Sequence, residues 1–231
     1  MNETTPESEA PKEVKRLREM QRRILGVLME KARTTPDAYP LSLNGLVTGC
    51  NQKSNRAPVL NLNSDQVEEC LADMRSEGIV AEVHGGGRVP KYRHYGYDFL
   101  GVKGAEAGVM AELLLRGEQT VGDLRTRASR FEPIADLAAL KTILKSLEDK
   151  NLVVALTAEG RGQIYTHNLY ESHELEAVKQ HVAAGGGGRL ASSSSSSPRV
   201  SGEDLEQLKQ TIADLQTQVR QLTERVTRLE S

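Results

Sequence analysis

Apolar residues recur at helical spacing near the start of the chain. Leu17, Ile24, Leu28 and Ala32 stand among Lys, Arg and Glu over residues 14–33. This period is typical of an amphipathic helix that buries one face. The segment TTPDAYP then ends the pattern, because proline interrupts a helix.

Capping residues mark the next two helices. Ser42 precedes a short apolar segment that ends near Gly49, and Asn63 followed by Gln66 forms a capping box for a third helix. Gly78 stands where the third helix should stop, since glycine adopts the left-handed conformation common after helix ends.

Two short strands are expected after the third helix. The segments IVAEV and RVPKYRHY, within residues 79–95, are rich in β-branched and aromatic residues and flank HGGG. Three helices followed by a two-stranded hairpin is the element order of a winged helix-turn-helix.

The same order recurs downstream. A helix is expected over residues 105–116, and Thr120 caps another that reaches about residue 130. When the two halves of the sequence are aligned so that Tyr92 matches Tyr165, Gly78 matches Asn151. The apolar residues of the first half then match apolar residues of the second. Both tyrosines are expected to complete a core, because the chain has little other aromatic mass. The copies differ in the connection between the second and third helices, which is longer in the first copy.

These patterns predict a mainly α fold with small β-hairpins (α+β), built from two tandem winged helix-turn-helix domains and followed by a flexible linker and a coiled-coil helix. The predicted organisation is a disordered tail over 1–12, winged-helix domains over 13–100 and 101–171, a short helix over 172–183, a Gly/Ser linker over 184–202 and a coiled coil over 203–231.

The last segment carries an apolar seam with alternating spacings of three and four residues. The predicted dimerisation residues are Leu205, Leu208, Ile212, Leu215, Val219, Leu222, Val226 and Leu229. β-Branched residues at most a positions and Leu at every d position favour a parallel dimer. The sequence therefore predicts a homodimer joined through its C-terminal coiled coil.

Composition and charge narrow the classes of partner. The 231 residues are 38% hydrophobic and 3% aromatic, which favours two small cores over one large core. The formal net charge of −2 gives no overall attraction to nucleic acid or to an anionic membrane, so such binding requires a local patch. No apolar stretch is long enough to span a bilayer, and Cys50 and Cys70 lack motif spacing, so a cytoplasmic protein without a membrane partner is expected.

Two segments resemble a known family. EKARTTPDAYPLSLNGLVTGCNQKSNRAPVLNL is similar to the signature segment of the YceH-like family of uncharacterised bacterial proteins, and LLLRGEQTVGDLRTRASRF is similar to its second-domain segment. The resemblance covers roughly residues 20–170. It implies a tandem winged-helix fold and supplies no mechanism.

Positive charge is concentrated in the connection after the second helix, on the first hairpin and after the second copy's second helix. The candidate DNA-binding residues are Lys53, Asn55, Arg56, Arg88, Lys91, Arg93, Arg125, Arg127 and Arg130. The amides of Asn51, Gln52 and Asn55 suit base edges, as Asn and Gln bind adenine. The alternative is that these amides brace a surface turn.

The third helix of the first copy is dense with carboxylates, which a phosphate backbone repels. Conventional major-groove reading by this helix is therefore not expected. The leading hypothesis remains a DNA-binding protein, a transcriptional regulator or DNA-associated accessory factor. The alternative is a protein-interaction module in which Glu68, Glu69 and Asp73 face a basic partner.

Catalytic and metal-binding patterns are absent from the sequence. His84, His94 and His167 lie on predicted hairpins, and no Cys or carboxylate completes a metal-ligand set. HGGGR joins two strands, whereas a phosphate-binding loop leads into a helix. No enzymatic activity, cofactor or metal is therefore predicted.

Overall fold

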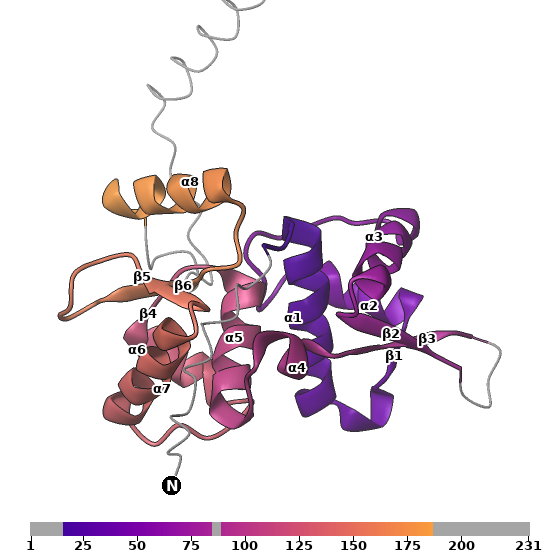
Figure 1. Cartoon of the computed structure of the whole chain (residues 1–231), viewed down its shortest axis with the longest axis horizontal. Coiled ribbons are helices and arrows are strands. Elements are labelled where there is room, and N and C mark those ends of the chain that lie inside the picture. The colour runs from indigo at the N-terminus through magenta and orange to yellow at the C-terminus, as the bar shows by residue number, and fades with distance from the viewer. Residues whose placement is uncertain (1–15, 85–88, 187–231) are drawn as a thin grey trace, which may run out of the picture. The chain divides into compact units, whose positions relative to one another are not determined.

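The computed structural model describes residues 16–84 and 89–186 (Figure 1). The predicted tail over 1–12, the coiled coil over 203–231, most of the linker and the candidate Arg88 lie outside the described residues. Two three-stranded antiparallel sheets and the helices around them make up the described part.

The first half contains three longer helices and one sheet. Its elements are α1 (Glu19–Thr34), the 3₁₀ turn η1 (Pro36–Ala38), β1 (Leu41–Ser42), α2 (Leu43–Cys50), α3 (Ser64–Ser76), β2 (Val80–Val83) and β3 (Lys91–His94). The second half has the same order of helices and strands, preceded by one short helix. Its elements are α4 (Gly96–Leu100), α5 (Gly104–Arg116), β4 (Gln119–Thr120), α6 (Val121–Ala128), α7 (Leu137–Asp149), β5 (Val153–Ala155), β6 (Ile164–His167) and α8 (Ser172–Ala183).

The predicted caps of the first half are confirmed. Ser42 Oγ accepts a hydrogen bond of 3.2 Å from the backbone N–H of Gly45 at the start of α2. Asn63 and Gln66 form both hydrogen bonds of the predicted capping box, at 2.9 and 3.0 Å. Gly78 has a φ of 71°, which ends α3 as the sequence predicted.

The second half begins and ends its helices in the same way. Thr120 Oγ1 accepts a hydrogen bond of 3.2 Å from the backbone N–H of Asp123. Asn151, which the repeat placed on Gly78, is also left-handed, with a φ of 56°. The short helix expected over residues 172–183 is observed as α8.

The two sheets have matching strand order and register. The orders are β1-β3-β2 and β4-β6-β5. Val80 pairs with His94 in the first sheet, and the equivalent Val153 pairs with His167 in the second. Tyr92 and Tyr165 are 4% and 8% exposed, so their predicted core roles are confirmed. The chain is thus mainly α with small antiparallel sheets, consistent with a winged-helix-like fold.

The core differs from the two small cores that composition favoured. The buried apolar side chains form one cluster that includes residues of both halves. The halves meet where α1 packs along α5, and Gly26 permits the approach, because a Cβ there would lie 3.0 Å from the Leu115 side chain. Packing between these two helices therefore joins what the repeat suggested were separate cores.

Within residues 16–84 and 89–186, no helix combines the length and the apolar composition that a membrane span requires.

Candidate functional site

The connection between α2 and α3 packs against both halves of the described chain. Asn51 braces its ends, since its side chain bonds the backbone N–H and C=O of Leu62, each at 2.8 Å. The backbone N–H of Ala57 donates to Leu115 O at 3.0 Å, which fixes the connection to α5. The bracing interpretation is therefore confirmed for Asn51.

Arg56 lies in the protein interior. Its side chain is fully buried, Nε donates to Gly49 O at 2.9 Å, and its terminal nitrogens bond both oxygens of the α1 residue Glu30. A DNA phosphate does not reach a guanidinium in this position. Lys53 and Asn55 of the same connection remain exposed, and Asn55 Oδ1 accepts a hydrogen bond from Arg116.

Glu30 belongs to a buried cluster of charges where α1 meets α5. Glu112 of α5 is fully buried, and the same terminal nitrogen of Arg130 lies 2.9 Å from Glu30 Oε1 and 3.0 Å from Glu112 Oε2. Arg116 Nε lies 2.9 Å from Glu112 Oε1, but its N–H is not aligned for a hydrogen bond, so this contact is an ion pair. Burial raises the pKa of Glu112, and the neighbouring guanidinium groups oppose that shift.

The two predicted cations at the end of α6, Arg125 and Arg127, also serve the fold. Arg125 donates to the backbone oxygens of Ile134 and Ala135, each at 3.3 Å. Arg127 donates to Gln119 Oε1 at 2.7 Å. With Arg130 held by two carboxylates, all three arginines predicted to bind DNA here contact other parts of the fold, and Arg125 holds the connection to α7.

An exposed basic face remains on the first sheet. Lys91 and Arg93 alternate with the buried Tyr92 and His94 along the central strand β3, so both cations point away from the core. Their cross-strand neighbours on that face are Ser42, Ala81 and Val83, none of which carries a carboxylate. The Arg93 guanidinium lies 5.2 Å from the ring centre of Tyr95, which is 39% exposed.

The equivalent face of the second sheet is buried. Ile164 and Thr166 occupy the positions of Lys91 and Arg93, and they are 7% and 0% exposed. The Thr166 and Tyr170 hydroxyl groups lie 3.1 Å apart, and α8 follows Tyr170 beside this sheet (Figure 1). Lys91 and Arg93 therefore have no charged, exposed counterparts in the second half.

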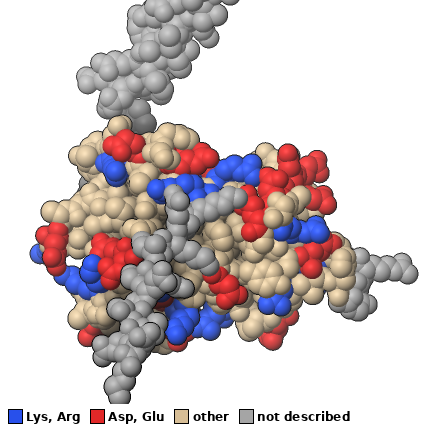
Figure 2. Space-filling view, viewed as in Figure 1, with Lys and Arg blue, Asp and Glu red and all other residues tan. Residues whose placement is uncertain are grey.

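Acidic side chains gather over α3 (Figure 2). Glu68 and Glu69 are exposed and form no ion pair among the described residues, whereas Asp73 pairs with Arg18. The equivalent helix α7 exposes Lys141 and Lys145, each in a surface ion pair with a carboxylate.

Two histidines, His94 and His167, and both cysteines are buried. His94 Nδ1 and His167 Nδ1 accept backbone hydrogen bonds of 3.0 and 3.3 Å. Burial lowers the pKa of His94 to about 4 and raises the pKa of Cys50 to about 12 and that of Cys70 to about 11. No group of three or more metal-ligating side chains occurs among the residues that the structure describes.

The chain is similar in sequence to one family of bacterial proteins. The family model described as "Protein of unknown function, DUF480" matches residues 17–161. A UPF0502 protein of Rhodopirellula baltica is 45% identical over 208 residues, which cover 88% of each chain. A UPF0502 protein of Saccharophagus degradans is 37% identical over 88% of this chain and 96% of its own length. One from Geotalea daltonii is 50% identical over 57% of this chain and 60% of its own length.

Proposed function

The chain belongs to the DUF480 (UPF0502) family of bacterial proteins, and from that premise we propose that it is a tandem winged-helix protein that binds duplex DNA without catalysing a reaction. It would act as a transcriptional regulator or DNA-associated accessory factor. The family resemblance read from the two sequence segments is confirmed by these matches. The DNA-binding role is our inference from geometry.

The tandem arrangement is supported by the internal match between the two halves. Each half runs helix, short strand, helix, helix and hairpin, and each hairpin strand register is the same. In such a unit the third helix and the hairpin, or wing, are the elements that face DNA. These elements are α3 with β2 and β3 in the first unit, and α7 with β5 and β6 in the second.

The observation that carries the proposal is the exposed basic face of the first sheet. Lys91 and Arg93 are free of ion pairs among the described residues and stand side by side, which suits contact with adjacent phosphates. Tyr95 adds an exposed aromatic ring beside Arg93. Phosphate contacts position a protein on duplex without reading its sequence, so binding of low sequence specificity is expected.

The acidic α3 stays outside the groove in this proposal, since its carboxylates would be repelled by the backbone. Lys53, exposed on the connection that precedes α3, supplies a further phosphate contact. Dimerisation through residues 203–231 would join two such faces and raise the affinity for a long duplex.

Replacing Lys91 and Arg93 together by Ala is expected to weaken binding to a random-sequence duplex about tenfold or more at low salt. The slope of log affinity against log salt should become shallower by about 2, because two phosphate contacts are lost. Fluorescence anisotropy of the labelled duplex across a salt series measures both quantities. Lys103→Ala with Lys179→Ala removes the same charge from exposed positions outside both hairpins and both third helices, and is the matched control. Unchanged affinity and slope in Lys91→Ala with Arg93→Ala would count against this face.

A protein-interaction role is the second candidate, and the exposed carboxylates of Glu68 and Glu69 on α3 favour it. Glu68 and Glu69 are solvent-exposed charges on a helix whose other face is anchored in the core by Val67, Leu71 and Met74. A basic partner surface would be attracted to such a helix.

Reversing Glu68 and Glu69 to Lys is expected to abolish capture of such a partner while leaving the unfolding midpoint nearly unchanged, because both side chains are exposed. Affinity capture with quantitative mass spectrometry provides the measurement. Glu159→Lys with Glu176→Lys is a control of equal charge at exposed positions away from α3. If the same proteins are captured by the α3 variant, α3 is not the interface.

A further inference from the structure

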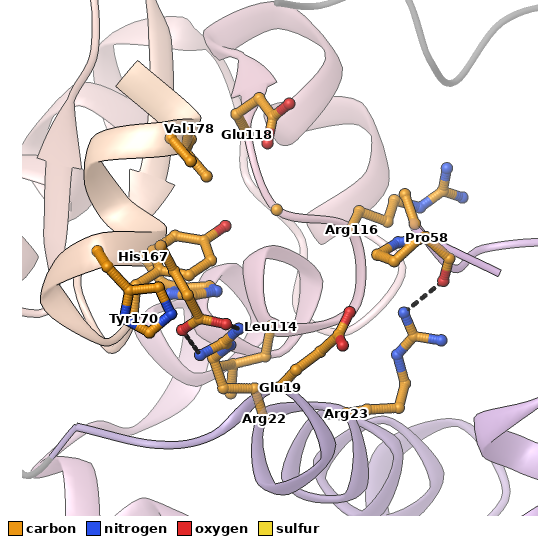
Figure 3. Close-up of a pocket in the computed structure, with 15 residues that line it drawn as sticks. Glu19, Arg22, Arg23, Pro58, Leu114, Arg116, Glu118, His167, Tyr170 and Val178 are labelled. Atoms are coloured by element: carbon orange, nitrogen blue, oxygen red, sulfur yellow. Dashed lines mark hydrogen bonds and ion pairs between the residues drawn. The ribbon is translucent and has the colours of Figure 1, made fainter. Parts of the chain in front are cut away.

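A cavity of about 440 Å³ lies between segments that are far apart in the sequence. Its walls come from the start of α1, the α2–α3 connection, the end of α5, the segment from His167 to Tyr170, and α8. Figure 3 shows His167 and Tyr170 on one side and Pro58 on the other. Its volume lies within the range of small-molecule sites, which often occur where structural units meet.

Arg23 is the unusual member of this lining. It is only 3% exposed, and its terminal nitrogens donate to Cys50 O at 3.0 Å and to Pro58 O at 2.6 Å. Its Nε is buried and has no hydrogen-bond partner, and among the described residues Glu19 acts on it only at longer range, without forming an ion pair. A buried guanidinium that contacts only carbonyl groups lacks the anion that normally accompanies such a charge.

The other two lining guanidinium groups already have carboxylates. Arg22 binds Glu174 of α8 through two hydrogen bonds of 2.7 Å and lies 4.6 Å from the ring centre of Tyr170. Arg116 is ion-paired with Glu112. Among the described residues, Arg23 is thus the lining arginine whose positive charge a ligand carboxylate would balance.

The rest of the lining limits the chemistry of that ligand. Leu114, Tyr170, Ala177 and Val178 provide apolar or aromatic surface. His167 remains uncharged, since burial lowers its pKa well below the usual value. Two further carboxylates, Glu19 and Glu118, also line the cavity, and they would repel a ligand with several negative charges.

We propose that this cavity binds a small organic monocarboxylate, with the carboxylate accepting from the second N–H of the Arg23 terminal nitrogens and the apolar body lying against Leu114, Tyr170 and α8. Arginine suits this role because its fork of N–H donors matches a carboxylate in geometry and charge. The site does not depend on the proposed DNA binding, so either can fail without the other.

Isothermal titration calorimetry of the full chain tests this proposal. Benzoate, indole-3-acetate and hexanoate are titrated, and each is compared with its uncharged amide. We expect at least one carboxylate to bind with a Kd below about 1 mM and about tenfold or more tightly than its amide. The amides match the acids in size and apolar surface, so the difference reports the recognition of charge.

Three variants locate the binding. Ala177→Trp, on an exposed position of α8, fills the cavity and should remove binding, whereas Ala183→Trp on the same helix lies outside the lining and should not. Arg23→Lys keeps the charge but loses the N–H fork, and should weaken binding about tenfold. The proposal is wrong if no carboxylate binds more tightly than its amide, or if Ala177→Trp binds as the original chain does. Because Ala177 is exposed, its replacement decides the matter even if Arg23→Lys does not fold.

Discussion

Replacing Glu30 by Ala is expected to lower the free energy of unfolding by about 3–5 kcal/mol, because removing one member of a buried ion pair leaves its partner charged and uncompensated. Arg56, whose side chain is fully buried, would keep only carbonyl partners, and Arg130 would lose one of its two carboxylates. Urea unfolding followed by circular dichroism measures the change. A value this large would be a substantial part of the stability of an ordinary domain.

The matched control is Glu132→Ala, which removes a carboxylate from the exposed pair with Arg33. Exposed pairs contribute about 0–1 kcal/mol, so this variant should unfold close to the original chain. The double variant Glu30→Leu with Arg56→Met should recover much of the loss, since apolar groups of similar volume can replace a buried pair. If Glu30→Ala costs no more than Glu132→Ala, the buried cluster does not stabilise the junction of α1 and α5.

Acidification is expected to destabilise the protein well above the pH at which carboxylates titrate. Burial lowers the pKa of His94 from 6.5 to about 4, and it lowers the pKa of His167 as well. Below pH 6.5 the unfolded chain therefore binds protons that the folded chain does not, so stability falls as pH falls. Between pH 7 and pH 5, His94 alone accounts for a loss of about 2 kcal/mol, and His167 adds to it.

Urea unfolding at a series of pH values tests this expectation. His94→Asn should flatten the dependence between pH 7 and pH 5, because Asn cannot be protonated but can offer an oxygen where Nδ1 accepts from Gly96. His173→Asn, at an exposed position, is the control and should leave the slope unchanged. Glu112, whose pKa burial raises, works in the opposite direction and is present in every variant. An identical slope in His94→Asn and the original chain would refute the role of His94.

Local signals explain what was predictable from sequence. The caps at Ser42, Asn63 and Thr120 and the left-handed Gly78 and Asn151 depend on residues within one helical turn, and the structure contains them all. By contrast, α4 spans only Gly96–Leu100, and β1 and β4 have two residues each, which is too short for a periodic pattern.

Local signals did not predict which basic residues are buried and which are exposed. In sequence, Arg56 resembles Lys53, because both stand in a polar connection, and only the folded chain brings Arg56 to Glu30. One signal was available, since Glu112 lies inside the apolar run VMAELLLR, where a carboxylate needs a buried partner. A second signal was that Ile164 and Thr166 stand in the second half where Lys91 and Arg93 stand in the first. Uncharged residues at these positions indicate that this face of the second sheet is buried.

If the proposed DNA-binding role holds, the asymmetry between the two sheets limits how many duplex sites one chain can occupy. If phosphate is bound by the open face of the first sheet, a single chain is monovalent, although its fold contains the unit twice. Bridging two DNA segments then requires two chains, so the dimer predicted through residues 203–231, and not the internal repeat, would supply the second duplex site. Under the proposed DNA-binding role, the repeated unit would enlarge the scaffold without adding a second duplex site.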